Sequence, residues 1–142
     1  MSAKESMDKT RLGLAGEFAV ASELLKRGKD VNLTLGNAKA VDLFVYDSNG
    51  GIKTVEVKTS RNKRFVTNFF QKYPTSGTPH PDIWVIVYID ADDVSNFYVL
   101  SHQEMADVQM QRNGMTSWQQ VNGVDNVRLN DIAIFKDLWG KI

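Results

Sequence analysis

The chain has 142 residues, of which 42% are hydrophobic and 24% are charged, and its formal net charge is zero. This length is enough to bury a true core, so we expect residues 1–142 to form one domain. The absence of cysteine excludes disulfides and thiolate metal sites and agrees with a reducing compartment. A polar start and short apolar runs predict neither a signal peptide nor a membrane span, so we expect a cytoplasmic protein.

The first predicted element is a helix over residues 11–27, which Gly28 is well placed to end. An apolar stripe repeats at helical spacing through Leu14, Phe18, Ala21 and Leu25. Glu17 flanks this stripe, and it points either at a functional site or at water. Gly13 and Gly16 beside it would let the backbone approach a neighbouring strand or a ligand.

Three strands are predicted next. Alternation of apolar and polar residues indicates a strand over residues 30–35, followed by a turn at Gly36 and Asn37. Two more alternating runs flank residues 47–51, which include the Asn-Gly pair favoured in β-hairpins. We therefore expect an antiparallel hairpin over residues 41–60.

The rest of the chain predicts two strands and several helical segments. Residues 62–74 fit either a helix or a strand with a loop. Residues 83–89 are continuously apolar, as in a buried strand, and residues 96–100 form a further strand. A capping box at Ser101 and Glu104 begins a helix that runs to about Arg112. A short helix or turn near the end would pack Trp139 on the body. This order predicts an α/β sandwich around a mixed sheet.

The hairpin brings charged residues together on one face. Side chains on a strand alternate with a period of two, so Glu56 and Lys58 project from the same side. Pairing of the two strands places Asp42 close to Glu56, on the face away from the core. Asp42 is surrounded by apolar residues, and a buried carboxylate needs a partner or a metal. The competing interpretation is an exposed edge carboxylate and a weak surface ion pair.

These residue types suit metal-dependent phosphate chemistry. Mg²⁺, for which Mn²⁺ could substitute, prefers oxygen ligands and often uses one or two carboxylates. Asp42 and Glu56 would supply the carboxylates, and the backbone carbonyl of Val57 would add a neutral ligand. A bound cation acidifies water and offsets charge on a phosphate, while Lys58 would orient the water or stabilise the pentavalent phosphorus.

Asp42, followed after a hairpin by Glu56-Val57-Lys58, resembles the D…ExK core of the PD-(D/E)XK nuclease superfamily. That superfamily includes restriction endonucleases and archaeal-type Holliday junction resolvases. The resemblance covers roughly residues 10–100 and implies a restriction endonuclease-like sandwich with an α-β-β-β-α-β core. It also implies catalytic roles for Asp42, Glu56 and Lys58, and Glu17 matches a first-helix glutamate that approaches the metal in some branches. At the position of the proline in the superfamily's name, just before the aspartate, this chain has Val41.

The charge is distributed unevenly, although it sums to zero. Residues 1–81 hold 13 Lys and Arg against 8 Asp and Glu, whereas residues 82–142 hold 4 against 9. A stretch free of acids follows the hairpin, and such basic patches are typical of phosphate binding. We expect Arg61, Lys63 and Arg64 to contact a DNA backbone; a solvated basic loop is the alternative.

Other patterns give weaker predictions. The acidic run at residues 90–93 lacks the glycine and glutamate of a calcium loop. His80 and His102 are too few and too isolated in sequence for a zinc site or a triad. Trp118, in polar surroundings, is the tryptophan most suited to stack on a base, although core anchoring is commoner.

The leading hypothesis is therefore a magnesium-dependent endonuclease acting on DNA. The first alternative is an inactive module of the same fold that binds nucleic acid or a protein partner in a defence or repair system. The second is a structural or assembly protein with no nucleic-acid role. The sequence does not specify the oligomeric state, for which a homodimer is one expectation.

Overall fold

The computed structural model describes residues 3–34, 41–119 and 123–142. The helices are α1 (Ala3–Lys26), α2 (Phe69–Lys72), α3 (His102–Arg112) and α4 (Leu129–Ile132), and two 3₁₀ turns follow over Ala133–Phe135 and Trp139–Lys141. The strands are β1 (Asp30–Leu33), β2 (Leu43–Tyr46), β3 (Ile52–Ser60), β4 (Arg64–Val66), β5 (Ile83–Ile89), β6 (Ser95–Ser101) and β7 (Asn126–Arg128). The predicted strand end at Leu35 and the turn at Gly36 and Asn37 lie outside the described residues.

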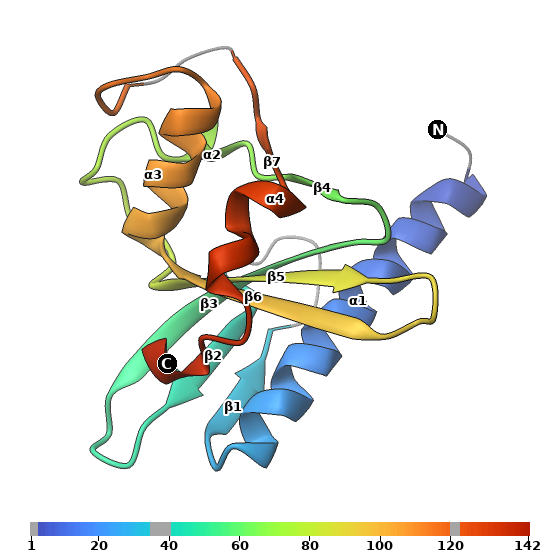
Figure 1. Cartoon of the computed structure of the whole chain (residues 1–142). Coiled ribbons are helices and arrows are strands. Elements are labelled where there is room, and N and C mark those ends of the chain that lie inside the picture. The colour runs from blue at the N-terminus through green and yellow to red at the C-terminus, as the bar shows by residue number, and fades with distance from the viewer. Residues whose placement is uncertain (1–2, 35–40, 120–122) are drawn as a thin grey trace.

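Five strands form a mixed sheet in the order β1-β2-β3-β5-β6. Its central pair, β3 and β5, is parallel, and the other neighbours are antiparallel. Helix α1 lies along one side of this sheet, while α2, α3 and α4 lie on the other (Figure 1). Strands β4 and β7 pair separately as a two-stranded ribbon. The predicted α/β sandwich around a mixed sheet is confirmed.

Both faces of the sheet are buried, but by different kinds of side chain. The face beneath α1 is largely aliphatic and is built from Val20, Ala21, Leu24, Leu43, Val45, Val55, Val57, Ile83, Val85, Val87, Ile89, Val99 and Trp139. The opposite face is rich in aromatic residues and comprises Phe65, Phe69, Phe70, Tyr73, Trp84, Ile86, Tyr98, Leu100, Met105, Ala106, Val127 and Ile132. Because both sheet faces carry a buried core, the charged residues of the hairpin must lie next to one of these cores.

Glu56 and Lys58 project toward the aromatic face. Glu56 pairs with Trp84 of β5 and Lys58 with Ile86, and paired residues in neighbouring strands share a face. Both β5 residues belong to the aromatic core. The expectation that this face lies away from the core was therefore wrong, because the segments after β3 fold back over it. The charged residues adjoin a second core.

Helix α1 is longer than predicted and presents a different side to the sheet. It begins at Ala3 rather than residue 11, and Gly28 follows its end with φ +84°, the left-handed conformation of a helix stop. Phe18 and Leu25 of the predicted stripe are 51% and 55% exposed. Of the predicted stripe, Ala21 is buried as expected, and the other buried residues of the helix are Gly16, Glu17, Val20 and Leu24.

Gly16 explains this orientation of α1. A Cβ atom at Gly16 would overlap the side chain of Thr59 on β3, whereas one at Gly13 would meet nothing within 4 Å. The missing side chain therefore lets the helix backbone approach the strand at Gly16, as expected for one of the two glycines. The helix packs against β3 at the Gly16–Thr59 contact, and the side that carries Phe18 faces the solvent.

The remaining segments agree in part with the predictions from the sequence. The capping box is confirmed, since Ser101 Oγ accepts from Glu104 N at 3.1 Å and Glu104 Oε1 accepts from Ser101 N at 2.8 Å. The ambiguous segment forms β4 and the single turn α2, and Trp139 packs into the aliphatic core at 5% exposure. The pairing of β4 with β7 was not predicted. Among the described helices, none has the length and apolar character needed to cross a membrane.

Candidate active site

Asp42 stands just before β2 and is held against β3. Its backbone N donates to Val55 O at 3.1 Å, and its Oδ2 accepts from Val57 N at 2.7 Å. Leu43 pairs with Val55, so the next residue back along the hairpin, Asp42, adjoins Glu56. Asp42 is only 6% exposed. This burial excludes the interpretation of Asp42 as an exposed edge carboxylate.

Glu56 and Lys58 form a close and largely buried pair beside Asp42. Lys58 Nζ lies 3.3 Å from Glu56 Oε1, and the side chains are 27% and 13% exposed. Burial raises the pKa of Glu56, and the nearby Asp42 carboxylate raises it further, whereas Lys58 lowers it. The structure thus brings together the two carboxylates and the ammonium predicted from the hairpin.

Lys72 adds a second ammonium, to which the sequence analysis assigned no role. It ends the one-turn helix α2, whose Phe69 and Phe70 are buried in the aromatic core. Burial lowers the pKa of Lys72, and the neighbouring Lys58 lowers it further, while Glu56 opposes both effects. Burial, together with the Glu56 charge, raises the pKa of Tyr73 to about 12. Glu56 therefore lies between two lysines and a neutral phenol.

Glu17 is buried in the part of α1 that is seated on β3. It is 5% exposed, and it follows Gly16, the residue that approaches Thr59. The interpretation of Glu17 as a glutamate directed at water is therefore wrong. In the described parts of the chain, no group of three or more His, Asp or Glu residues is arranged to hold a metal. The catalytic role predicted for Glu17 stays a prediction.

The donor set at Asp42 and Glu56 fits a hard divalent cation. Burial and, secondarily, the charge of Asp42 raise the pKa of Glu56, and a cation between the two carboxylates would offset their repulsion. Carboxylate oxygens are the ligands that Mg²⁺ and Mn²⁺ prefer, and Mg²⁺ usually retains several waters. Two protein carboxylates are thus enough to bind one Mg²⁺ ion, with water as the remaining ligands.

A cationic groove of about 790 Å³ adjoins the site. It is lined by Lys9, Leu12, Gly13, Lys58, Thr59, Ser60, Arg61, Asn62, Lys63, Arg64, Val66 and Arg128, which include no acidic residue. The three predicted backbone-binding residues, Arg61, Lys63 and Arg64, all line it. Arg61 also pairs with Asp93 at 2.7 Å, with both side chains more than half exposed. Sequence reasoning missed Lys9 and Arg128, which other elements bring to the same groove.

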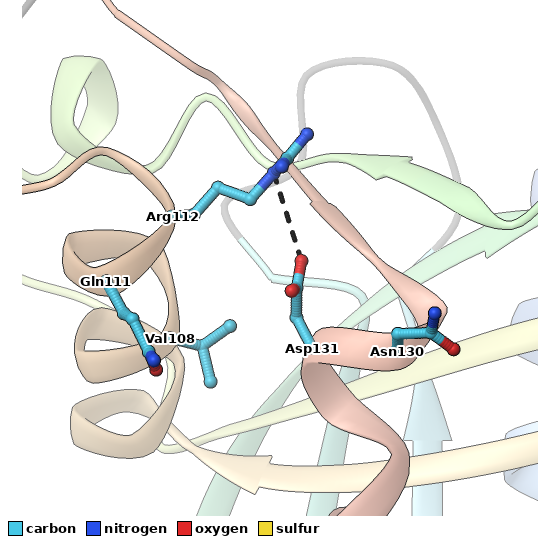
Figure 2. A pocket seen from close by; sticks show the side chains of 5 residues that line it. All are labelled: Val108, Gln111, Arg112, Asn130 and Asp131. Atoms are coloured by element: carbon cyan, nitrogen blue, oxygen red, sulfur yellow. Dashed lines mark ion pairs between the residues drawn. The ribbon is translucent and has the colours of Figure 1, made fainter.

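A second pocket, of about 430 Å³, lies between α3 and α4 and is lined by Val108, Gln111, Arg112, Asn130 and Asp131. Figure 2 shows Arg112 and Asp131 facing each other across it, with Arg112 Nε 3.8 Å from Asp131 Oδ2. Arg112 also donates to Asn126 of β7, through Nη2 to Oδ1 at 3.0 Å. These contacts tie α3, α4 and β7 together, so the charged residues here have a structural role.

The two histidines are not isolated in space, contrary to the expectation from their spacing. Their rings stack with centroids 3.8 Å apart at an angle of 3°. His102 Nδ1 accepts from Trp84 Nε1 at 3.0 Å, and burial, followed by the neighbouring His80, lowers its pKa to about 4. Stacked rings do not converge on a metal, so no zinc site follows. Trp118 donates through Nε1 to Tyr73 O at 2.8 Å and packs on Phe69, which makes it a core anchor.

No family model and no curated protein matches the chain. Among solved structures, a bacterial homing endonuclease, I-Ssp6803I, aligns with a TM-score of 0.53 and 17% identity over 91% of this chain and 86% of that chain. Hjc, a Holliday junction resolvase from Archaeoglobus fulgidus, aligns with a TM-score of 0.49 and 11% identity over 86% of this chain and 93% of that chain. The likeness to the homing endonuclease confirms, at the level of the fold, the restriction endonuclease-like sandwich predicted from the hairpin.

Proposed function

We propose that this protein is a metal-dependent endonuclease that hydrolyses phosphodiester bonds in DNA. The observation that carries this proposal is the buried Asp42 carboxylate beside the partly buried Glu56, with Lys58 Nζ 3.3 Å from Glu56 Oε1. The fold of DNA nucleases supports it. The adjoining groove supports it as well, because six basic residues and no acidic residue line a surface suited to phosphates.

In this mechanism, Asp42 and Glu56 would hold Mg²⁺ or Mn²⁺, and the backbone carbonyl of Val57 would be a further candidate ligand. When bound, such a cation would supply an acidified water and offset phosphate charge. The hydrogen bond from Val57 N to Oδ2 orients the Asp42 carboxylate on β3. Glu17, buried in α1, would assist through a water or a second cation.

Lys58 is the residue placed to act on the reacting groups. Its ammonium can hold the attacking water or stabilise the phosphorane oxygens as negative charge develops on them. Lys72 supplies a second positive charge next to Lys58 and Glu56. It would keep Lys58 directed toward the substrate by repelling it from α2, and it would contribute to binding of the scissile phosphate.

The first test measures cleavage of supercoiled, linear, branched and single-stranded DNA with Mg²⁺ or Mn²⁺. Asp42→Asn, Glu56→Gln and Lys58→Ala should each lower the rate by about a hundredfold or more, because each removes an interaction with the reacting groups. Asp107→Asn, which neutralises an exposed carboxylate on α3, is the matched control and should cut like the parent.

Two outcomes contradict the proposal. If the purified parent cuts none of these substrates with either metal, the endonuclease proposal is wrong. DNA binding without cleavage would then support the inactive module. Full activity in all three site variants, or in excess chelator, would place the chemistry elsewhere.

A further inference from the structure

The ribbon formed by β4 and β7 places two arginines opposite each other. Arg64 pairs with Arg128 in the antiparallel register, and residues in such pairs project from the same face. Both arginines are exposed, whereas Phe65 and Val127, next to them on the ribbon, are 2% and 0% exposed. The ribbon thus buries one side in the aromatic core and presents an arginine pair on the other.

Like charges directly opposite each other on paired strands are destabilising. The ribbon nevertheless fixes this arrangement, because Leu129 N donates to Lys63 O at 3.0 Å beyond the arginine pair. The nearby Asp131 carboxylate accepts from the backbone N of Arg128 at 2.8 Å through Oδ2, and the same oxygen lies 3.8 Å from Arg112 Nε (Figure 2). An anion bridging the two guanidinium groups would remove the repulsion.

The same two arginines line the cationic groove that contains Lys58. Lys9, from the first half of α1, lines the same groove. The groove therefore runs from the proposed catalytic lysine to a pair of guanidinium groups, each able to bind phosphate through two parallel hydrogen bonds. A polyanion with regularly spaced phosphates matches this charge.

We propose that Arg64 and Arg128 clamp a single backbone phosphate of a DNA strand, that Lys9 binds a neighbouring phosphate, and that the groove thereby leads the strand to Lys58. This inference rests on the proposed function for the identity of the ligand as DNA. It assigns to the C-terminal part of the chain, through Arg128, a role in substrate binding that the hairpin residues alone do not supply.

The experiment measures binding of a fluorescent DNA duplex by anisotropy, in chelator and at several salt concentrations. Arg64→Ala and Arg128→Ala should each weaken binding on the order of tenfold, as expected for loss of a charged hydrogen-bonded contact. The double variant should flatten the dependence of log affinity on log salt by about one unit, rather than two, because both arginines bind one phosphate. Its loss of binding free energy should therefore be less than the sum of the single losses.

Lys26→Ala is the matched control for Lys9→Ala. Lys26 lies at the far end of the same helix and does not line the groove, so it removes an equal charge elsewhere. Lys9→Ala should weaken binding and lower the salt dependence, while Lys26→Ala should leave both close to the parent. Urea unfolding should show that the arginine variants are at least as stable as the parent, because they relieve repulsion.

Parent-like binding and salt dependence in the two arginine variants would overturn this inference, and cleavage by the parent would still support the proposed function. Weakened binding in these variants, with no cleavage by the parent in Mg²⁺ or Mn²⁺, would support the groove and contradict the endonuclease. A parent that binds no DNA at low salt would overturn both.

Discussion

The two faces of the central sheet differ in what their burial achieves. Beneath α1, aliphatic side chains and the Gly16–Thr59 contact hold a helix tightly, and the packing is almost entirely apolar. On the other face, aromatic residues pack beside polar groups, so that burial changes the pKa values of Glu56 and His102. One face therefore mainly supports the fold, while the other also sets the electrostatics of the candidate site.

The largest expected effect tests whether the aromatic face alone supports the site. Phe69→Ala should cost about 3–5 kcal/mol of stability, and Leu24→Ala on the α1 face about 2–5 kcal/mol. Both side chains are at most 1% exposed. Phe69→Ala should also lower the cleavage rate per folded molecule, because it loosens the turn that carries Lys72. Leu24→Ala should preserve that rate.

These two variants are compared by urea unfolding and by cleavage assays at a temperature where both are folded. Equal loss of activity per folded molecule in the two variants would mean that the faces do not differ in this way.

The next effect concerns the pH dependence of stability. The folded-state pKa of His102 is about 4, below its ordinary value of 6.5, so the unfolded chain binds the proton more readily between these values. Stability should therefore fall as pH decreases from about 6.5 to about 4, by about 2–3 kcal/mol from this group. Glu56 acts in the opposite direction, because its raised pKa favours the protonated folded form, whose stability is lost as pH rises.

The contribution of His102 is isolated by comparing the parent with His102→Gln and with His80→Gln in urea titrations at pH 7, 5.5 and 4. His102→Gln should lose much of the acid-side decrease, whereas His80→Gln, at an exposed position, should retain most of it. An unchanged pH profile in His102→Gln would show that the aromatic face does not hold this ring neutral.

The smallest effect tests how α1 is seated. Gly16→Ala should destabilise the protein by about 1–3 kcal/mol, because the added methyl group overlaps Thr59 and forces the helix away from β3. Gly13→Ala is the control, since a Cβ there meets nothing within 4 Å and alanine improves helix propensity by up to about 1 kcal/mol. Thermal unfolding of the two variants gives the comparison. Similar stabilities would contradict the close contact at Gly16.

The parts of the site that depend on short-range geometry could be predicted from the sequence. The positions of Asp42, Glu56 and Lys58 follow from a period of two and one hairpin turn, and the structure keeps them together. The burial of Asp42 also followed from its apolar neighbours. What each residue does in catalysis stays a prediction.

The orientation of α1 could not be predicted in this way. The helix carries apolar residues on more than one side, so periodicity alone does not distinguish the Phe18 side from the Val20 side. The choice is made by a single close approach at Gly16, which depends on the tertiary position of Thr59.

Lys72 and Arg128 were missed for a different reason. Each reaches its place through a short element, the single turn α2 and the three-residue strand β7, whose sequence signals are weak. The strand partner of Arg128 is also far away in the chain, since Arg128 pairs with Arg64. Pairings of such separation are fixed by the whole fold rather than by local patterns.

The β4–β7 ribbon has a consequence for folding and for local opening. Closing it requires a long intervening segment to be ordered, so such pairings form late, at an entropic cost that grows with loop length. With three residues in each strand and two facing arginines, it should open more readily than the five-stranded sheet and exchange its amide hydrogens sooner. An anion between the arginines would stabilise the closed ribbon and slow that exchange. Binding of a phosphate would therefore also order this part of the chain.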